Sequence, residues 1–263
     1  MKIKDFIKTI DKTYPNISQM DFDNSGANIV DFDADIEGVL VCLDATLNAI
    51  NYAHKNNLNL IVTHHPFIFN AIKNINDDPL AKRIKQLIKY NINIYSIHTN
   101  FDVNLKNGMA KILRNKLYKD SEIVKESFIV NYTIDSKKYG LGNIIVLKKP
   151  EKYVDLLDRI RTRLDVDYDK LSFYNVANEK LIKKIVIIPG SGSSDIDLVI
   201  KEKPDMVITS DLKHNQIIDL IDTGISYVDA SHYALEKEFV PQIIKYLNKI
   251  KIKNIHSFNI DCM

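Results

Sequence analysis

The stretch "LNLIVTHHPFIF" (residues 58–69) joins a mostly apolar run to two consecutive histidines and a proline. Its first half, 58–63, is short and rich in branched apolar side chains, which predicts a strand buried on both faces of a sheet. Pro66 lacks a backbone N–H and restricts the residue before it, so we expect the strand to end at His64 and His65. Neighbouring side chains on a regular strand point to opposite faces, but a break in the pleating here would let both imidazoles face one pocket.

The residues on either side alternate between strand and helix patterns. Short apolar runs end in polar residues, and the segments between them carry apolar residues at helical spacing. Pro79 lies in the first turn of one such helix, where proline is favoured. The expected strands are 37–43, 58–63 and 92–99, and the expected helices are 46–56, 77–91 and 108–118. Buried strands joined by amphipathic helices indicate parallel βαβ units with helices on both faces.

The pattern changes from about residue 127, where strands follow one another closely enough to indicate some antiparallel pairing. Expected strands lie within 126–135, 139–149, 183–195 and 204–214, an expected helix spans 153–164, and a long helix within 225–250 precedes a last strand at 253–261. We therefore expect an α/β protein with two α/β lobes, each with a mostly parallel sheet flanked by helices. The first lobe would combine 1–126 with 228–263, and the second would comprise 127–227.

Composition limits the classes of function that the chain can serve. Of its 263 residues, 45% are hydrophobic and 27% are charged, which suits two lobes with a sizeable core. The 36 Lys and Arg residues nearly balance the 34 Asp and Glu residues, and the net charge of +2 argues against a nucleic-acid partner. Cys42 and Cys262 form no C-x-x-C motif, so we expect neither a disulfide framework nor a thiolate zinc site.

The N-terminal segment 1–15 is charged throughout and places Ile3, Phe6, Ile7 and Ile10 on one face. This pattern predicts an amphipathic helix rather than a signal peptide. No run approaches the ~18 apolar residues that a membrane span requires. We therefore expect a cytoplasmic protein without a membrane partner.

Polar side chains gather where the expected strands of the first half end. They are Asp44, His64, His65, His98 and Asp102. Open α/β sheets bind ligands beyond the carboxyl ends of their strands, so these side chains lie where such sheets carry their chemistry. Imidazole and carboxylate groups can bind metal ions or transfer protons. Each could also be an ordinary polar strand end, and Asp102 could cap the helix that follows it.

A second pair, His232 and Glu236, is four residues apart on an expected helix. That spacing places both side chains on one face about one turn apart, within reach of a common ion. The same spacing also occurs in ordinary exposed pairs, so this pair alone does not identify a site. A metal site is favoured because the pair occurs together with the polar strand ends.

Several segments together resemble the NIF-three-like family, whose members are also called GTP cyclohydrolase 1 type 2 homologues. The segments "VTHHPFIF" (62–69), "YSIHTNFDV" (95–103) and "SHYALEKEF" (231–239) look like three signature segments of that family. "FDNSGANI" (22–29) looks like its N-terminal segment, with Phe22 where Trp is usual. The three histidine-bearing segments make the resemblance specific.

Shorter segments follow in the family's order, so the resemblance covers nearly the whole chain. They are "LDAT" (43–46), "YGLGNI" (139–144), "GSGSS" (190–194) and "TSDLKH" (209–214). Ser210 stands where Gly is common, which puts the backbone geometry of that segment in question. Asp211, Lys213 and His214 of the same segment could reach a substrate. The "GSGSS" turn lacks the Gly-Lys-Ser/Thr of a phosphate-binding Walker loop, so we interpret it first as a strand–helix turn.

The resemblance implies a dinuclear metal site in the cleft between the two lobes. It implies as ligands His64, His65, Asp102, His232 and Glu236, which match the family's positions in residue type. It also implies a toroidal homohexamer with its sites facing an interior cavity. Three imidazoles and two carboxylates without a thiolate suit Zn, Fe, Mn, Co or Ni better than Ca or Mg. We therefore expect two divalent transition-metal ions per chain.

Two hypotheses for function follow from such a site. Five protein ligands for two ions leave coordination positions open, and two ions can share and activate a water. The first hypothesis is a metal-dependent hydrolase that attacks a small-molecule substrate, a nucleotide or a phosphoester, through metal-bound hydroxide. GTP cyclohydrolase action is its narrowest form. His98 and Asp44 are candidates for orienting the ligands or transferring protons.

The alternative hypothesis is a non-enzymatic metal-binding ring that stores, delivers or senses metal, or an adaptor whose ions are incidental. Weak and exchangeable metal without turnover would favour it. A clamp around nucleic acid is the least supported function, because the near-neutral charge predicts poor binding at physiological salt.

Overall fold

The computed structural model describes residues 1–175 and 181–259. The chain divides into two compact units, and each has a sheet of its own. The first unit comprises Met1–Phe101 and Glu238–Met263, and the second comprises Asp102–Lys237. The first unit is therefore assembled from both ends of the chain.

A five-stranded sheet forms the centre of the first unit. Its strands, in sheet order, are β1 (Gly26–Ile29), β4 (Asn93–Ser96), β3 (Leu60–Thr63), β2 (Val39–Cys42) and β11 (Ile255–Ser257). β4, β3, β2 and β11 are parallel, and β1 pairs with β4 in the antiparallel sense. Every residue of β2, β3 and β4 is buried, as expected for strands covered on both faces.

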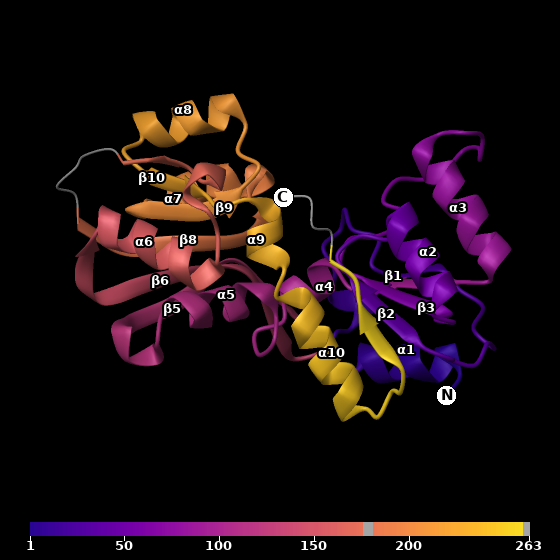
Figure 1. Cartoon of the computed structure of the whole chain (residues 1–263). Coiled ribbons are helices and arrows are strands. Elements are labelled where there is room, and N and C mark those ends of the chain that lie inside the picture. Colours follow the sequence, from indigo (N-terminus) through magenta and orange to yellow (C-terminus); the bar gives the residue numbers. More distant parts are fainter. Residues whose placement is uncertain (176–180, 260–263) are drawn as a thin grey trace. The chain divides into compact units, whose positions relative to one another are not determined.

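Helices cover both faces of this sheet: α1 (Ile3–Asp11), α2 (Leu47–Lys55), α3 (Pro79–Tyr90) and α10 (Phe239–Lys249). Leu40, Ile61 and Ile94 pack in one cluster with apolar residues of α2 and α3. On the opposite face, Phe6 of α1 meets Tyr95 edge-on, with ring centroids 6.1 Å apart. The consecutive residues Ile94 and Tyr95 thus serve two different layers, which are seen in Figure 1 with α2 and α3 apart from α1 and α10.

The ends of α2 and α3 follow from local side-chain chemistry. Thr46 caps α2 by accepting a hydrogen bond from the backbone N–H of Ala49. Asp78 caps α3 in the same way through the N–H of Ala81, and Pro79 occupies the first position of that helix. These caps satisfy backbone donors that would otherwise be left unpaired at a helix start.

A six-stranded sheet forms the centre of the second unit. Its strands, in sheet order, are β5 (Ile123–Ile134), β6 (Lys137–Lys152), β8 (Leu181–Ser191), β9 (Met206–Ser210), β10 (Ser226–Asp229) and β7 (Ser172–Tyr174). β8, β9 and β10 are parallel. The pairs β5–β6, β6–β8 and β10–β7 are antiparallel. The mostly parallel pairing expected in both lobes is therefore found in the first sheet, whereas the second sheet is mixed, because β5, β6 and β7 pair in the antiparallel sense.

The helices of the second unit are α5 (Met109–Leu117), α6 (Tyr153–Leu164), α7 (Ile196–Glu202), α8 (His214–Asp222) and α9 (His232–Glu236). Val199 of α7 and Leu220 of α8 pack with Val186 and Val207 of the central strands. α5 and α6 contact each other and β6. The predicted class, an α/β protein with two sheets flanked by helices, is confirmed.

Two segments lie in the second unit that the sequence pattern assigned to the first lobe, namely 102–126 and 228–237. α5 packs on β6, β8 and α6, and α9 contacts β8 and β9, so both segments help to form the core of the second unit. The expected long helix within 225–250 is divided into α9 and α10, because Lys237 and Glu238 interrupt it.

The N-terminal segment forms the predicted amphipathic helix α1. Ile3, Phe6 and Ile10 are buried, and Ile7 is partly buried. Within the described ranges no helix combines the length and the apolar character needed to cross a membrane.

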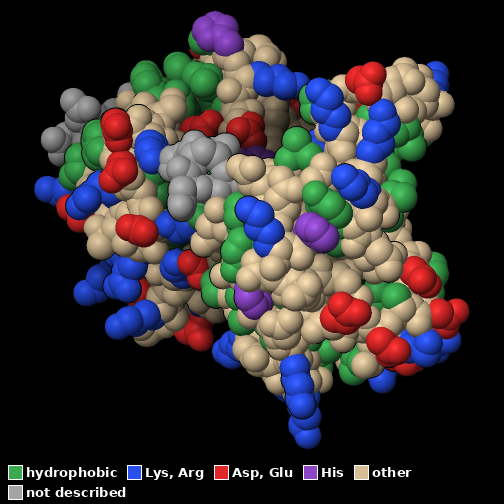
Figure 2. Space-filling model, turned by 45° about the vertical axis from the view of Figure 1, so that its right-hand side comes forward, with side chains coloured by type: hydrophobic (Ala, Val, Ile, Leu, Met, Phe, Trp, Pro, Cys, Tyr) green, Lys and Arg blue, Asp and Glu red, His purple; other side chains and the backbone are tan. Residues whose placement is uncertain are grey.

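The surface carries both signs of charge. Figure 2 shows Lys and Arg interspersed with Asp and Glu over the face that it presents, in keeping with the net charge of +2. Cys42 is buried in β2 as a free thiol, and Cys262 lies outside the described residues.

Candidate metal centre

Three histidines, here called the histidine group, gather at one edge of the first unit's sheet. His64 and His65 follow β3, and His98 follows β4 by two residues. β3 and β4 are parallel neighbours with Thr63 opposite Ser96, so their carboxyl ends lie at the same edge. Each imidazole offers one ligand nitrogen, and these atoms lie within 4.8 Å of one another. That spacing is close to what a shared ion with metal–nitrogen bonds of about 2.1 Å would require.

His64 and His65 lie on the same side although they are consecutive. The N–H of His64 donates to the carbonyl of Cys42 (3.3 Å), and the N–H of His65 donates to the carbonyl of Leu43 (3.1 Å). In a regular ladder, consecutive residues do not both donate to one neighbouring strand, so the pleating is broken here. The Thr63 hydroxyl donates to the His65 carbonyl (2.8 Å), and the two ring centroids are 5.2 Å apart. The break predicted at the end of this strand is therefore present.

Each ring of the histidine group is held through its Nδ1 atom. The partners are the Ile97 carbonyl for His64 (2.9 Å), the Asp44 carboxylate for His65 (2.9 Å) and the Asp23 carboxylate for His98 (2.8 Å). Carbonyl and carboxylate oxygens only accept hydrogen bonds, so Nδ1 carries the proton in each ring and Nε2 carries the lone pair in the neutral form. A neutral imidazole anchored in this way binds metal through Nε2.

Asp44 and His98 are the two residues that we expected to assist the ligands. Asp44 does hold His65 in place, which agrees with an orienting role. His98 belongs to the histidine group itself and offers a ligand atom alongside His64 and His65. His98 is therefore placed to bind a metal ion directly and not only to orient the other ligands.

Asp23 was not identified from the sequence, although it lies in the quoted segment 22–29. Its side chain is buried and accepts hydrogen bonds from His98 Nδ1 (2.8 Å), the Ser25 hydroxyl (2.7 Å) and the Thr99 N–H (3.0 Å). Burial raises the pKa of Asp23, but the hydrogen bonds from His98, Thr99 and Ser25 outweigh burial and hold that pKa well below its usual range. Asp23 therefore stays ionised and fixes His98.

Asp102 ends the short helix α4 (Thr99–Asp102), one turn after His98. It is only 6% exposed. α5 starts later along the chain, and its N-cap is Gly108. Asp102 is therefore not the N-cap of α5, so helix capping does not explain its presence.

His232 and Glu236, here called the α9 pair, interact within the second unit. His232 Nε2 lies 3.0 Å from Glu236 Oε2, and the Glu236 side chain is nearly buried. His232 Nδ1 contacts the Asp211 carboxylate at 2.5 Å. The two side chains thus share one helix face, as their spacing predicted. Asp211 anchors His232 as Asp44 anchors His65, a role that sequence reasoning had not assigned to it.

The backbone around the α9 pair is unusual. Gly190, Asp211 and Ser231 follow or end the parallel strands β8, β9 and β10, and their φ angles are +56°, +57° and +64°. A Cβ atom at Gly190 would lie 2.1 Å from Glu236 Oε1 and 3.2 Å from His232 Nε2. Only glycine leaves room for the carboxylate there. Such left-handed residues tend to cluster at functional sites, where the surrounding structure maintains them.

Ser210, which differs from the glycine common in the family, fits this arrangement. Its hydroxyl donates to the Gly190 carbonyl (2.7 Å) and so joins the ends of β8 and β9. The Asp229 carboxylate accepts from the backbone N–H groups of Leu212 (3.2 Å) and Ser231 (3.3 Å). Burial raises the pKa of Asp229. These contacts hold the loops that carry Asp211 and His232.

The predicted ligands are distributed over both units. His64 and His65 belong to the first unit, and Asp102, His232 and Glu236 belong to the second. In each unit the donors are imidazole nitrogens or carboxylate oxygens, a combination that suits first-row transition metals. These features define an α/β protein with side-chain groups suited to metal binding.

The Duf34/NIF3 (NGG1p interacting factor 3) family model matches residues 1–263, and the chain therefore belongs to that family. The "GTP cyclohydrolase 1 type 2 homolog" of Clostridium perfringens is 32% identical over 252 residues, which cover 95% of this chain and 92% of the relative. The protein of the same name from Clostridium acetobutylicum is 30% identical over 237 residues, which cover 90% and 85%. The family resemblance found in the sequence is confirmed.

A solved structure shows the same fold. The crystal structure of a Staphylococcus aureus hypothetical protein superimposes with a TM-score of 0.83 at 26% sequence identity. The match covers 100% of this chain and 98% of that chain.

Proposed function

We propose that this chain is a dinuclear metal-binding protein that hydrolyses a nucleotide or another phosphoester. The proposed ligands are His64, His65, Asp102, His232 and Glu236, and the proposed ions are two divalent transition metals from among Zn, Fe, Mn, Co and Ni. The observation that carries the proposal is the histidine group, whose ligand nitrogens lie within 4.8 Å of one another. The names of the relatives add GTP to the substrates worth testing.

The side chains of both units fit such a role. In the histidine group each Nδ1 is anchored by a carbonyl or carboxylate oxygen, which sets the tautomer that metal binding needs. In the second unit, glycine at position 190 leaves a space beside Glu236 and His232 that a Cβ would fill. His232 and Glu236 lie together there, so an ion bound at this place would have a nitrogen and an oxygen ligand on one helix face.

When bound, two such ions supply an activated water nucleophile and stabilise negative charge on the attacked group. The chain's own residues hold the ligands and manage protons. Asp44 and Asp211 keep the Nδ1 protons of His65 and His232 in place. His98, fixed by Asp23, would take up or release a proton at Nε2 beside the ligands.

Metal content tests the proposal directly. After reconstitution and desalting, elemental analysis should find about two ions per chain, the number that a two-metal hydrolase uses. His64→Ala and Glu236→Ala should each lower that content while the circular dichroism spectrum is kept. His54→Ala is a matched control, because His54 is exposed, stacks on Tyr90 and belongs to neither group of described side chains that could hold a metal. Less than one ion per wild-type chain, or full loading in both ligand variants, would refute the assignment.

Activity distinguishes the enzyme from the metal-binding ring without catalysis. Metal-loaded protein should hydrolyse at least one member of a panel of nucleotides, GTP included, and phosphoesters. A chelator should abolish the turnover, and His64→Ala should lack it. Full metal loading without turnover on the panel would favour metal storage, delivery or sensing instead. Turnover that survives in His64→Ala would come from a contaminant.

The toroidal homohexamer stays a prediction from the family resemblance. Light scattering on the purified protein should find six chains per particle. A monomer or dimer at micromolar concentration would contradict the ring.

A further inference from the structure

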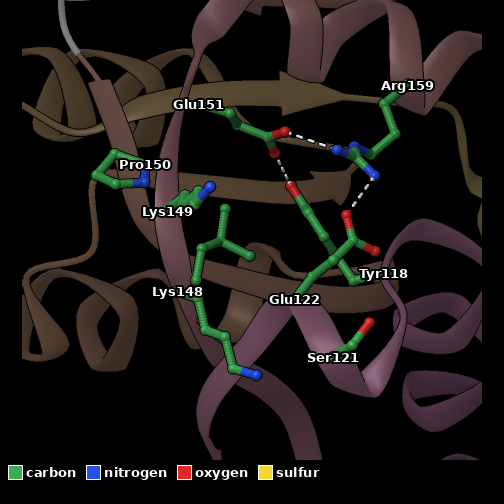
Figure 3. Close-up of a pocket in the computed structure, with 9 residues that line it drawn as sticks. Tyr118, Ser121, Glu122, Lys148, Lys149, Pro150, Glu151 and Arg159 are labelled. Carbon is green, nitrogen blue, oxygen red and sulfur yellow. Dashed lines mark hydrogen bonds and ion pairs between the residues drawn. The ribbon is translucent and has the colours of Figure 1, made fainter.

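A cavity of about 310 Å³ lies wholly within the second unit. It is bounded by the end of α5, the turn after it, the last part of β6 and one side chain of α6 (Figure 3). Its lining contains none of the proposed metal ligands. Its charged side chains indicate which kind of ligand it could bind.

The wall that β6 contributes is irregular. Val146 is opposite Lys184 of β8, and Glu151 is opposite Ile182, so residues 147–150 bulge out against a single residue of the neighbouring strand. Consecutive side chains of a regular strand point to opposite faces, yet the consecutive lysines of this bulge both line the cavity. Bulges of this kind re-aim side chains and are frequent beside binding sites.

The carboxylates of the cavity already have partners. The Tyr118 hydroxyl donates to one oxygen of Glu151, and Arg159 Nη2 donates to the other (2.8 Å). Arg159 Nη1 donates to one oxygen of Glu122 (3.1 Å), and the backbone N–H of Lys119 donates to the other (2.7 Å). Figure 3 shows the three side-chain contacts as a chain across the cavity. Each of the four carboxylate oxygens thus already accepts one hydrogen bond, and a single guanidinium lies between the two carboxylates.

Arg159 and Tyr118 are committed to this network. The guanidinium of Arg159 lies 4.7 Å from the centroid of the Tyr118 ring and also donates to the carbonyl of Leu117 (3.3 Å). Burial and the charge of Glu151 raise the pKa of Tyr118, so its hydroxyl stays protonated and acts as a donor. These side chains are therefore held by their contacts with one another.

Lys148 and Lys149 also line the cavity but take no part in this network. Both are exposed, and neither forms an ion pair with any residue in the described part of the chain. In Figure 3 the two side chains extend in different directions, and the Lys148 ammonium group points away from Glu151. Arg159 carries one positive charge against two carboxylates, and the two ammonium groups bring the sum to +1. The net positive charge of the lining thus favours an anion.

We propose that this cavity binds a small phosphorylated ligand through Lys148 and Lys149. A phosphate group carries about 1.5–2 negative charges at pH 7 and several strong acceptor oxygens, and both lysine side chains are exposed, so each can turn toward it. The volume is at the lower end of the range of small-molecule sites, which suits a phosphate monoester of modest size. This site does not depend on the proposed metal chemistry.

Calorimetric titration of chelator-treated, full-length protein with inorganic phosphate and with glycerol phosphate tests the proposal. Removal of metal prevents phosphate from binding at the metal centre. We expect saturable one-to-one binding, weakened at least tenfold in the double variant Lys148→Ala, Lys149→Ala. The matched control is Lys137→Ala with Lys138→Ala, which removes the same charge from exposed positions at the other end of β6. Thermal melting verifies that both variants are folded.

The proposal is overturned if the wild type shows no saturable binding, or if the two double variants lose affinity equally. Unchanged affinity in the Lys148 and Lys149 variant would also overturn it. Succinate, which carries two carboxylates, tests the assignment to phosphate, and equal affinity for succinate would contradict it. Tighter binding of glycerol phosphate than of inorganic phosphate would support an organic phosphoester as the ligand, and the reverse order would support the free ion.

Discussion

The histidine group and the α9 pair place similar side chains by different physical means. In the histidine group the backbone keeps ordinary negative φ angles, and hydrogen bonds from Nδ1 to a carbonyl or a carboxylate orient each ring. The α9 pair instead depends on left-handed backbone at Gly190, Asp211 and Ser231. Both arrangements use hydrogen-bond anchors, and the second relies in addition on a backbone shape that few residues can adopt.

This difference has a consequence for tolerance to substitution. A changed anchor in the histidine group alters the orientation and basicity of one ring but leaves the chain in an ordinary conformation. A changed residue beside the α9 pair must also accept a left-handed backbone, which costs about 1–2 kcal/mol for most side chains. Substitutions near the α9 pair should therefore affect folding as well as metal binding.

The largest effect is expected for Gly190→Ala. The new Cβ would lie 2.1 Å from Glu236 Oε1, so the nearly buried carboxylate must move, and a φ of +56° adds backbone strain. Disrupting a buried ionic contact costs about 3 kcal/mol or more. Chemical denaturation should show a loss of that order in the free energy of unfolding, and elemental analysis should show reduced metal content.

Gly224→Ala is the matched control for this substitution. Gly224 also has a positive φ of +72°, but a Cβ there meets no atom within 4 Å. It should therefore cost only the backbone strain, about 1–2 kcal/mol, and leave metal content unchanged. Equal unfolding free energies and equal metal contents in the two variants would show that the close contact with Glu236 has no effect. The proposed dependence of the α9 pair on its backbone would then be wrong.

Asp23→Asn should have the next largest effect, this time in the histidine group. An amide nitrogen in place of either carboxylate oxygen would face a donor, since His98 Nδ1 contacts one oxygen and the Thr99 N–H the other. Loss of hydrogen bonds to a buried charged group costs about 1.5–3 kcal/mol. We expect a lower unfolding free energy of that size and, by nitrogen-detected NMR, a changed tautomer of His98.

The exposed Asp77 provides the control for this change. Its side chain is 92% exposed and contacts only Lys85 among the described ion pairs, so Asp77→Asn should change stability by less than about 0.5 kcal/mol. An Asp23→Asn variant as stable as this control, with the tautomer of His98 unaltered, would show that the anchor has no orienting role.

Much of the fold was predictable because buried strands and amphipathic helices leave strong patterns. The helix expected at 153–164 is observed as α6 with the same bounds, and the strand expected at 58–63 is observed as Leu60–Thr63. The interruption at Lys237 and Glu238 was not predictable, since "ALEKEFV" keeps helical spacing across it. The bulge of β6 was also hidden, because an apolar run does not reveal where its partner strand skips residues.

The site was predictable where a side chain follows a strand and less so where it comes from a loop. His64, His65 and His98 are recognisable from strand ends alone. Asp23 is not, because its role depends on a contact with His98 that spans 75 positions of the chain. Asp211 was singled out only as a residue that could reach a substrate, since nothing in the local pattern indicates that it contacts His232.

The smallest effects concern the two carboxylates that anchor one ligand ring in each region. Replacing the anchor of a metal-ligating histidine typically lowers metal affinity about 10–100-fold. We therefore expect Asp44→Asn and Asp211→Asn to weaken metal binding by about this amount, measured by competition with a chelating dye, with little change in stability. Asparagine tolerates the left-handed φ of +57° at position 211, so the fold is kept.

Alanine at the same positions separates hydrogen bonding from backbone shape. Asp44 has an ordinary φ, so Asp44→Ala should match Asp44→Asn in both metal affinity and stability. Asp211→Ala should match Asp211→Asn in metal affinity but lower the unfolding free energy by about 1 kcal/mol more, because alanine disfavours the left-handed region. Equal stability of all four variants would mean that the backbone around the α9 pair is unstrained, and the distinction between the two regions would then reduce to their hydrogen bonds.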